Sequence, residues 1–166
     1  MVLTKGKTMT VFDELGLKVE KSNPEENVVL NIVRTSLILT KIMAQTLSVY
    51  KLTPPKFNIL MLVRYYEKDG GISQSSISKK LIVSGSNITG IIDRLEKAEL
   101  VVREPIVGDR RVNLVKITDK GKDLVEKAWK VYIEKTEEIT ESLTKKEKEA
   151  IVSILSKWRK ILCKKW

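Results

Sequence analysis

The sequence predicts a mainly α-helical α+β fold with one small β-hairpin, and three observations predict it. Apolar residues recur at a spacing near 3.6 over long stretches at both ends of the chain, as in amphipathic helices. Two short helical stretches separated by a polar turn lie between them. Two short β-branched stretches then flank a basic tip that contains glycine. The expected order is therefore four helices, a hairpin and two further helices.

Length and composition fit one folded domain with a basic surface. The chain has 166 residues, of which 42% are apolar and 31% charged, so a core is possible and general disorder is not expected. Lys and Arg number 31 and Asp and Glu 21, which gives a formal net charge of +10. This excess favours a polyanionic partner, either nucleic acid or an anionic membrane; general solubility is the alternative.

Missing residue types exclude whole classes of chemistry. There is no histidine and only one cysteine, Cys163, which excludes Ser–His and Cys–His nucleophiles, histidine- or cysteine-rich metal sites and an internal disulfide. We therefore expect no enzymatic activity, no metal and no cofactor. No run of about 18 apolar residues and no secretory signal is present, which predicts a cytoplasmic protein without a membrane span.

The first half of the chain contains an arm and two helices. Residues 1–22 form an arm that is either disordered or a short docking helix. Asn23 and Pro24, followed by two glutamates, are typical of a helix start, and this helix runs to about Leu52. The next helix opens at Pro54 and runs to about Tyr66.

The middle of the chain contains the two short helices and the hairpin. The first short helix covers about 74–81, and serines at 84 and 86 supply N-cap chemistry for the second. The second carries one apolar stripe, expected to be buried: Ile88, Ile91, Ile92, Leu95 and Ala98. The hairpin strands are 101–106, confined to a sheet edge by Pro105, and 112–117.

The last third of the chain predicts two long helices. Thr118 caps the first, and a capping box from Thr144 to Glu147 starts the second.

Two short helices followed by a basic hairpin make a winged helix-turn-helix over residues 53–117. Residues 23–52 and 118–166 then form a helical layer whose apolar stripes are expected to bury against a second copy in a homodimer; packing within one monomer is the alternative.

Two surfaces of this unit are candidates for contact with double-stranded DNA. On the second short helix, the side opposite the isoleucines carries Ser84, Ser86, Asn87, Thr89, Gly90 and Arg94. Hydroxyls, an amide and free N–H groups at a helix start bind phosphates and base edges, and an outward glycine allows a groove wall to approach. A merely solvated polar face is the alternative.

The hairpin tip, or wing, is the second surface. It carries Asp109, Arg110 and Arg111, and arginine is favoured in a narrow minor groove. Further candidates for phosphate contact are Arg103, Lys79, Lys80 and Lys116, although each alone is more often an ordinary surface charge.

The residues that carry this pattern resemble the MarR family of transcription factors. The matching pieces, in order, are L-T-P-P-K-F-N-I-L, S-N-I-T-G-I-I-D-R-L-E, L-V-V-R, D-R-R, I-T-D-K-G and L-T-K-K-E. The resemblance covers roughly residues 28–162. Members often have glycine just before the first wing strand, where this chain has Glu99.

The resemblance implies a homodimeric regulator, most often a repressor, that binds a pseudo-palindromic operator and responds to a small phenolic or anionic ligand or to cysteine oxidation. It implies that Arg111 enters the minor groove, held by Asp109. Cys163 fits an oxidation sensor poorly, because oxidation-sensing relatives place their cysteine in the first helix.

A ligand pocket is expected where the helical layer meets the winged unit. Its candidate lining is Tyr50, Phe57, Met61, Arg64, Tyr65 and Trp129. For any one of these, a place in the core is the alternative. The alternative function is a winged-helix module that binds another protein without reading DNA.

Overall fold

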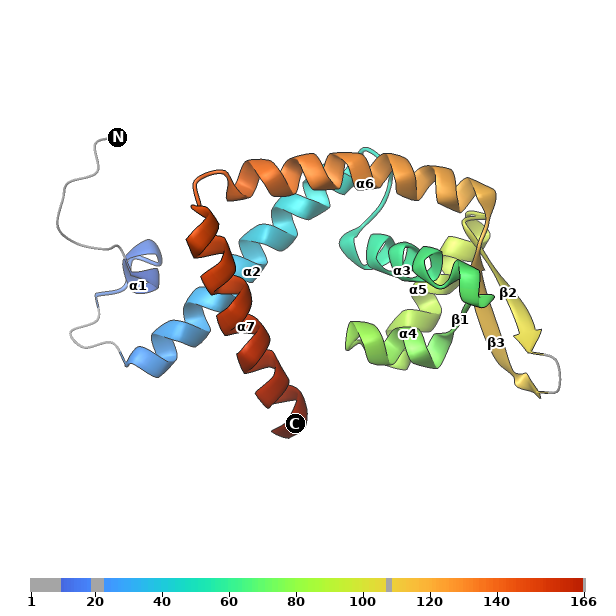
Figure 1. The fold of residues 1–166 in the computed structure, drawn as a ribbon, viewed down its shortest axis with the longest axis horizontal. Coiled ribbons are helices and arrows are strands. Elements are labelled where there is room, and N and C mark those ends of the chain that lie inside the picture. The colour runs from blue at the N-terminus through green and yellow to red at the C-terminus, as the bar shows by residue number, and fades with distance from the viewer. Residues whose placement is uncertain (1–9, 19–22, 107–108, 166) are drawn as a thin grey trace. The chain divides into compact units, whose positions relative to one another are not determined.

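The computed structural model describes residues 10–18, 23–106 and 109–165, and for residues 106, 109–112 and 165 it describes the backbone only. In chain order the elements are α1 (Val11–Glu14), α2 (Pro24–Ser48), α3 (Pro54–Tyr65), the 3-10 turn η1 (Glu67–Asp69), β1 (Ile72–Ser73), α4 (Gln74–Leu81), α5 (Gly85–Lys97), β2 (Val101–Ile106), β3 (Asp109–Ile117), α6 (Asp119–Thr140) and α7 (Lys145–Lys165) (Figure 1). They confirm the mainly helical fold with a small β-wing.

The chain divides into two compact units, Met1–Gln45 and Thr46–Trp166, which we describe separately. In the first unit, α1 begins with a capping box between Thr10 and Asp13. Its Val11 and Phe12 are buried. Glu14 forms an ion pair with Arg34 of α2, which joins the arm to the long helix. Residues 11–14 of the arm are therefore helical, one of the two states expected for it.

Helix α2 is long and apolar enough to cross a membrane by length and composition alone. Its most apolar stretch of 18 residues has a mean hydropathy of 1.3. It is the single helix among the described ranges that meets this criterion. Polar residues such as Asn31 and Arg34 interrupt its apolar run, which is why the sequence predicted no membrane span. A helix that packs on another protein helix meets the same criterion.

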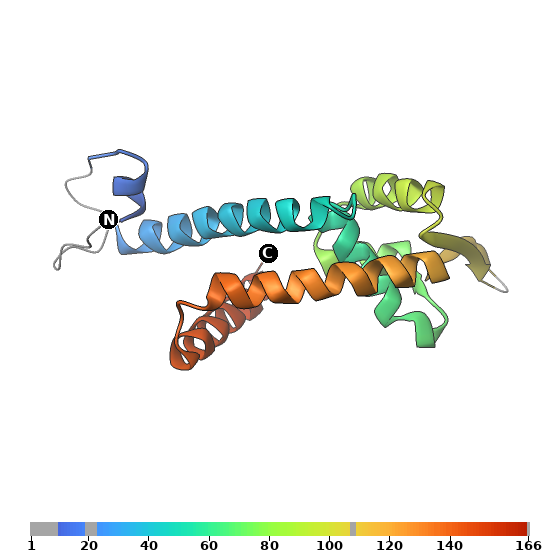
Figure 2. The same cartoon turned by 90° about the horizontal axis from the view of Figure 1, so that it is seen from above.

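The second unit contains the predicted winged helix-turn-helix. Its core gathers apolar side chains from the helices of the winged unit and from α6, among them Leu60 of α3, Ile77 of α4, Ile92 of α5 and Ala128 of α6. The β2–β3 hairpin projects beyond the helices α3, α4 and α5 (Figure 1, Figure 2). In the predicted α5 stripe Ile91 is only partly buried, and the predicted burial is wrong at Ala98, which is exposed because it already caps the end of the helix.

The sheet has three antiparallel strands in the order β1-β3-β2, one more than the sequence predicted. Strand β1 pairs Ile72 with Val115 and Ser73 with Leu114. Two residues are too few to show an alternating pattern, so no pattern in the sequence predicts this strand. Strand β2, which contains Pro105, lies at the edge as predicted.

The predicted helix starts are confirmed where a side chain caps the backbone. The Asn23 side chain accepts a hydrogen bond from the Glu25 N–H at 2.9 Å. Thr118 Oγ1 accepts from the Gly121 N–H at 3.0 Å and donates to the Glu99 carbonyl at 2.7 Å. The capping box between Thr144 and Glu147 is formed.

Helix α5 ends at Lys97 with Ala98 as its C-cap, and the next residue, Glu99, has a left-handed φ of +61°. The Leu100 N–H donates to the Leu95 carbonyl at 3.0 Å and the Glu99 N–H to the Glu96 carbonyl at 2.8 Å. These two bonds define a Schellman motif, whose left-handed position usually holds glycine. The backbone therefore leaves the helix in the left-handed conformation that favours glycine, but the residue at this position is Glu99.

Glu99→Gly is expected to raise the free energy of unfolding by about 1 kcal/mol, because glycine removes the steric cost of the left-handed backbone. Urea unfolding measures this change. Glu99→Ala is the control, because it removes the exposed Lys120 ion pair but keeps the backbone strain. Equal stability of the two variants would show that Glu99 is not strained.

Candidate nucleic-acid interface

Helix α5 separates a buried apolar side from an exposed polar one. Ile88, Ile92 and Leu95 are fully buried in the core of the winged unit. Most of the predicted DNA-contacting residues are exposed, and Gly90 is half-buried: Ser84, Ser86, Asn87, Thr89, Gly90 and Arg94. The structure therefore places all six on the accessible part of one helix and its N-cap.

The start of α5 leaves its first turn open to an anion. Ser84 occupies the N-cap position, but its side chain forms no capping hydrogen bond. Its hydroxyl lies 3.4 Å from the Ser86 hydroxyl instead. An uncapped helix start directs N–H groups and the positive end of the helix dipole outward, which favours phosphate.

Gly90 has no packing reason to be glycine within the described part of the chain. A Cβ atom built at this position meets no atom within 4 Å. Glycine inside a helix costs about 1 kcal/mol relative to alanine. The open space over Gly90 leaves room for a surface that approaches the helix backbone closely.

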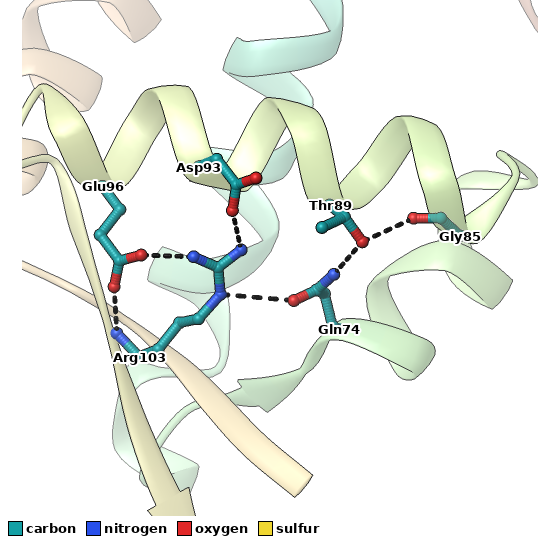
Figure 3. Close-up of polar contacts among 6 residues, drawn as sticks. All are labelled: Gln74, Gly85, Thr89, Asp93, Glu96 and Arg103. Atoms are coloured by element: carbon teal, nitrogen blue, oxygen red, sulfur yellow. Dashed lines mark hydrogen bonds and ion pairs between the residues drawn. The ribbon is translucent and has the colours of Figure 1, made fainter. Parts of the chain in front are cut away.

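Arg103, expected as a phosphate contact, is turned toward α5 in this structure (Figure 3). Its Nη2 donates to Asp93 Oδ1 at 2.5 Å, and its Nη1 donates to Glu96. The Arg103 backbone N–H also donates to Glu96 Oε1 at 3.0 Å. The side chain is only 19% exposed, so it joins the base of the wing to α5.

The charge of Arg103 is secured by this arrangement. Burial lowers the pKa of the guanidinium, but the hydrogen bonds to Asp93 and Glu96 outweigh burial and raise the pKa above its ordinary value. Arg103 therefore stays a donor at every pH at which the protein is folded.

Sequence reasoning missed Gln74, the first residue of α4. Its Nε2 donates to Thr89 Oγ1 at 2.5 Å, and its Oε1 accepts from Arg103 Nε at 3.4 Å. The acids at 93 and 96 lie three residues apart on one side of α5, and that spacing was a signal for a basic partner. No comparable signal connects Gln74 with Thr89, which lie 15 residues apart.

The wing tip lies at the limit of the described residues. The backbone of Asp109, Arg110 and Arg111 forms the start of β3, and the pairing with β2 shifts register between Pro105 and Ile106. The side chains of these three residues lie outside the described part of the structure, so their DNA contacts stay a prediction.

The lysine candidates differ in their surroundings. Lys116 is paired with Glu104, and the Lys80 ammonium lies 5.2 Å from the centre of the Tyr66 ring. Lys79 is exposed on α4.

Three of the predicted pocket residues belong to an aromatic and apolar cluster between α3 and α6. Phe57 is buried and stacks on Trp129 with ring centres 6.4 Å apart. Trp129 in turn stacks on Tyr132 at 5.5 Å. Met61 is partly buried and packs on the same core.

The other three are placed differently. Tyr50 is partly buried and packs on the core, whereas Arg64 pairs with Glu67 and Glu126. Tyr65 is 76% exposed and meets the edge of Tyr66. The structure therefore does not bring all six together around one space.

A cavity of about 310 Å³ lies between α3, α4 and α5. None of the six predicted pocket residues lines it. Its lining is Pro55, Asn58, Ile59, Leu81, Val83, Asn87, Ile88, Ile91 and Arg94. Two of the predicted DNA-contacting residues, Asn87 and Arg94, thus border an apolar space beneath α5.

Comparison of the sequence with known proteins identifies relatives along most of the chain. A protein-family sequence model, described as MarR family, matches residues 52–112. The HTH-type transcriptional regulator PecS of Dickeya dadantii is 31% identical over 135 residues, which cover 81% of this chain and 81% of PecS. The HTH-type transcriptional regulator MhqR of Bacillus subtilis is 30% identical over 106 residues, which cover 64% of this chain and 71% of MhqR.

Solved structures share the fold. The transcriptional repressor CouR bound to a 23-mer DNA duplex superposes with a TM-score of 0.77 at 24% identity and covers 86% of this chain and 99% of its own. The S. aureus MepR–DNA complex gives a TM-score of 0.73 at 23% identity and covers 84% of this chain and 99% of its own.

Proposed function

Because the chain belongs to the MarR family of transcriptional regulators, we propose that it represses transcription by binding a pseudo-palindromic DNA operator as a homodimer. The α5 helices of the two copies enter successive major grooves, about 34 Å apart, and the wings enter the flanking minor grooves. The protein acts in the cytoplasm, where it has access to DNA.

The observation that carries this proposal is the exposed side of α5. It combines an uncapped helix start, hydroxyl and amide side chains, and a glycine over which nothing packs. Phosphates bind at such a helix start, and side chains of this kind bind base edges. The DNA duplexes bound to CouR and MepR in their own structures support the same partner here.

The apolar stripes of α2 and α7 support the homodimer. Leu37 of α2 is 66% exposed and Ile154 of α7 is 64% exposed. Large apolar side chains exposed in a row along a helix are typical of a surface that a partner covers. A second copy of this chain presents the same two stripes and so gives a self-complementary interface.

An aromatic or anionic effector is also part of the proposal. CouR of Rhodococcus jostii has been solved with p-coumaroyl-CoA, which supports a ligand of this kind for a chain of the same fold. The Trp129 ring is 41% exposed and stacks on the buried Phe57, where α6 meets the winged unit, so it offers a flat apolar surface for an aromatic group. Binding there changes the distance between the two α5 helices and therefore DNA affinity.

Fluorescence anisotropy tests the proposed function. The full-length protein is titrated onto the DNA upstream of its own gene and onto scrambled DNA of equal length, over a series of salt concentrations. We expect a large ratio of specific to random affinity. Equal and steeply salt-dependent binding to both would show electrostatic attraction alone. Absence of binding at low salt would favour the protein-binding module.

Arg111→Ala is expected to weaken operator binding about 10-fold to 100-fold and to leave the dimer intact, because a minor-groove arginine contributes to affinity and not to the helical interface. The same anisotropy assay measures the loss, and light scattering measures the mass. Lys145→Ala, which removes an exposed charge at the start of α7, is the control. Unchanged operator affinity in Arg111→Ala would refute the role of the wing.

A further inference from the structure

We propose that Gln74 is a positioning residue that makes the Thr89 hydroxyl an acceptor, so that Thr89 selects a base with an exocyclic amino group in the major groove. This inference rests on the proposed function. Three contacts carry it: Arg103 with Gln74, Gln74 with Thr89, and Thr89 with the Gly85 carbonyl (Figure 3).

Arg103 fixes the direction in which this series of hydrogen bonds runs. A guanidinium can only donate, so the end of the Gln74 amide that faces Arg103 Nε must be its oxygen. The two amide ends look alike in shape, and only the partners decide between them. Arg103 cannot turn away easily, because Asp93 and Glu96 hold its other two nitrogens.

The orientation of Thr89 follows from that of Gln74. With its oxygen directed at Arg103, Gln74 directs its NH₂ group at Thr89 Oγ1, 2.5 Å away. Thr89 must therefore accept this bond. Its single hydroxyl hydrogen is donated to the Gly85 carbonyl at 3.0 Å. One lone pair of the hydroxyl remains, so toward solvent Thr89 is an acceptor and not a donor.

An acceptor on the exposed side of α5 discriminates between bases. In the major groove, adenine and cytosine present an amino group that donates, whereas guanine and thymine present a carbonyl oxygen that accepts. Thr89 in the orientation fixed by Gln74 pairs with the first two and leaves the carbonyl of the others without a donor. A serine or threonine hydroxyl that rotates freely reads either kind of base.

The position of Gln74 is itself fixed by the fold. Ser73 ends β1, whose partner Leu114 lies in β3, and its hydroxyl accepts from the Ser76 N–H at 3.2 Å to cap α4. Gln74 is the first helical residue after this cap. The sheet and the cap therefore hold the side chain that orients Thr89.

Gln74→Met tests the inference, because a thioether of similar length has no N–H group to donate to Thr89. The Thr89 hydroxyl is then free to rotate, so it can donate to a base carbonyl or accept from an amino group. Full-length wild type and variant select from the same library of randomised duplexes, and the enriched pools are sequenced. At one operator position we expect wild type to prefer adenine or cytosine and Gln74→Met to lose that preference about 10-fold.

Three further variants distinguish the proposed role of Gln74 from a general loss of folding or of DNA binding. Ser75→Met places the same side chain one residue away, at an exposed site outside the relay of hydrogen bonds from Arg103 through Gln74 to Thr89, and is expected to keep the base preference. Thr89→Val is expected to abolish the preference at the same position, and Thr89→Ser to retain it. Circular dichroism and thermal unfolding confirm that each variant is folded.

The outcomes distinguish the inference from the proposed function. A position whose base preference changes in Gln74→Met and in Thr89→Val, but not in Ser75→Met, supports the relay. Specific selection by wild type with an unchanged preference in both relay variants overturns the relay and leaves the regulator intact. No enrichment by wild type overturns the proposed function, and the relay with it.

Discussion

Ile154→Glu is expected to turn the protein into a monomer and to lower operator affinity at least about 100-fold, since a dimer gains two to four orders of magnitude by binding two half-sites together. Ile154 lies on the apolar stripe of α7 with Ile151, Ile161 and Leu162, all of them exposed in the single chain. A carboxylate at the centre of such a stripe must lose its hydration without a partner when two copies associate.

Light scattering measures the mass, and anisotropy measures operator affinity. Ser153→Glu is the matched control, because Ser153 is exposed and is turned about 100° from Ile154 around the helix, away from the stripe. It adds the same charge without entering the stripe. An Ile154→Glu protein that stays dimeric would place the interface elsewhere than on α7.

Gly121→Ala is expected to lower the free energy of unfolding by about 2 to 3 kcal/mol, as in other overpacked sites. A Cβ atom at this position would lie 2.2 Å from the Leu100 carbonyl oxygen and 2.8 Å from Ile117 Cγ1. The oxygen belongs to backbone that is fixed by its own hydrogen bond from the Thr118 N–H, at 3.1 Å. The first turn of α6 therefore cannot accept a side chain without moving away from β2 and β3.

Gly90→Ala is the matched comparison, because the space beside Gly90 is open and alanine favours the helix. It is expected to raise the free energy of unfolding by about 1 kcal/mol and to weaken DNA binding. Urea unfolding measures both variants. Equal effects of the two substitutions on stability would show that the Leu100 backbone moves to accommodate the new methyl group.

The sequence predicted most of the fold because its signals are local. Helix α4 begins and ends at the predicted residues, Gln74 and Leu81, and the caps at Thr118 and Thr144 are formed. Caps and periodicity depend on residues within a few positions of one another. Strand β1 was missed because its pairing depends on a strand about 40 residues later, at Leu114 and Val115.

The candidate site was predicted by residue type and only partly by arrangement. The exposed side of α5 follows from helical spacing, and Asn87 and Thr89 are exposed as expected. Arg103 was expected to face a phosphate, whereas in the structure Asp93 and Glu96 hold it. Such contacts between separate elements depend on how α5 and β2 pack, and one sequence carries no spacing that reports it.

Strand β1, although only two residues long, has a consequence for how the two DNA surfaces act together. It pairs with β3, whose other end begins at the wing tip, and it leads directly into Gln74. Ser73 thus links the wing sheet to the first turn of α4, and Gln74 links that turn to Thr89. If the proposed function holds, we expect the minor-groove and major-groove contacts to be energetically coupled rather than additive.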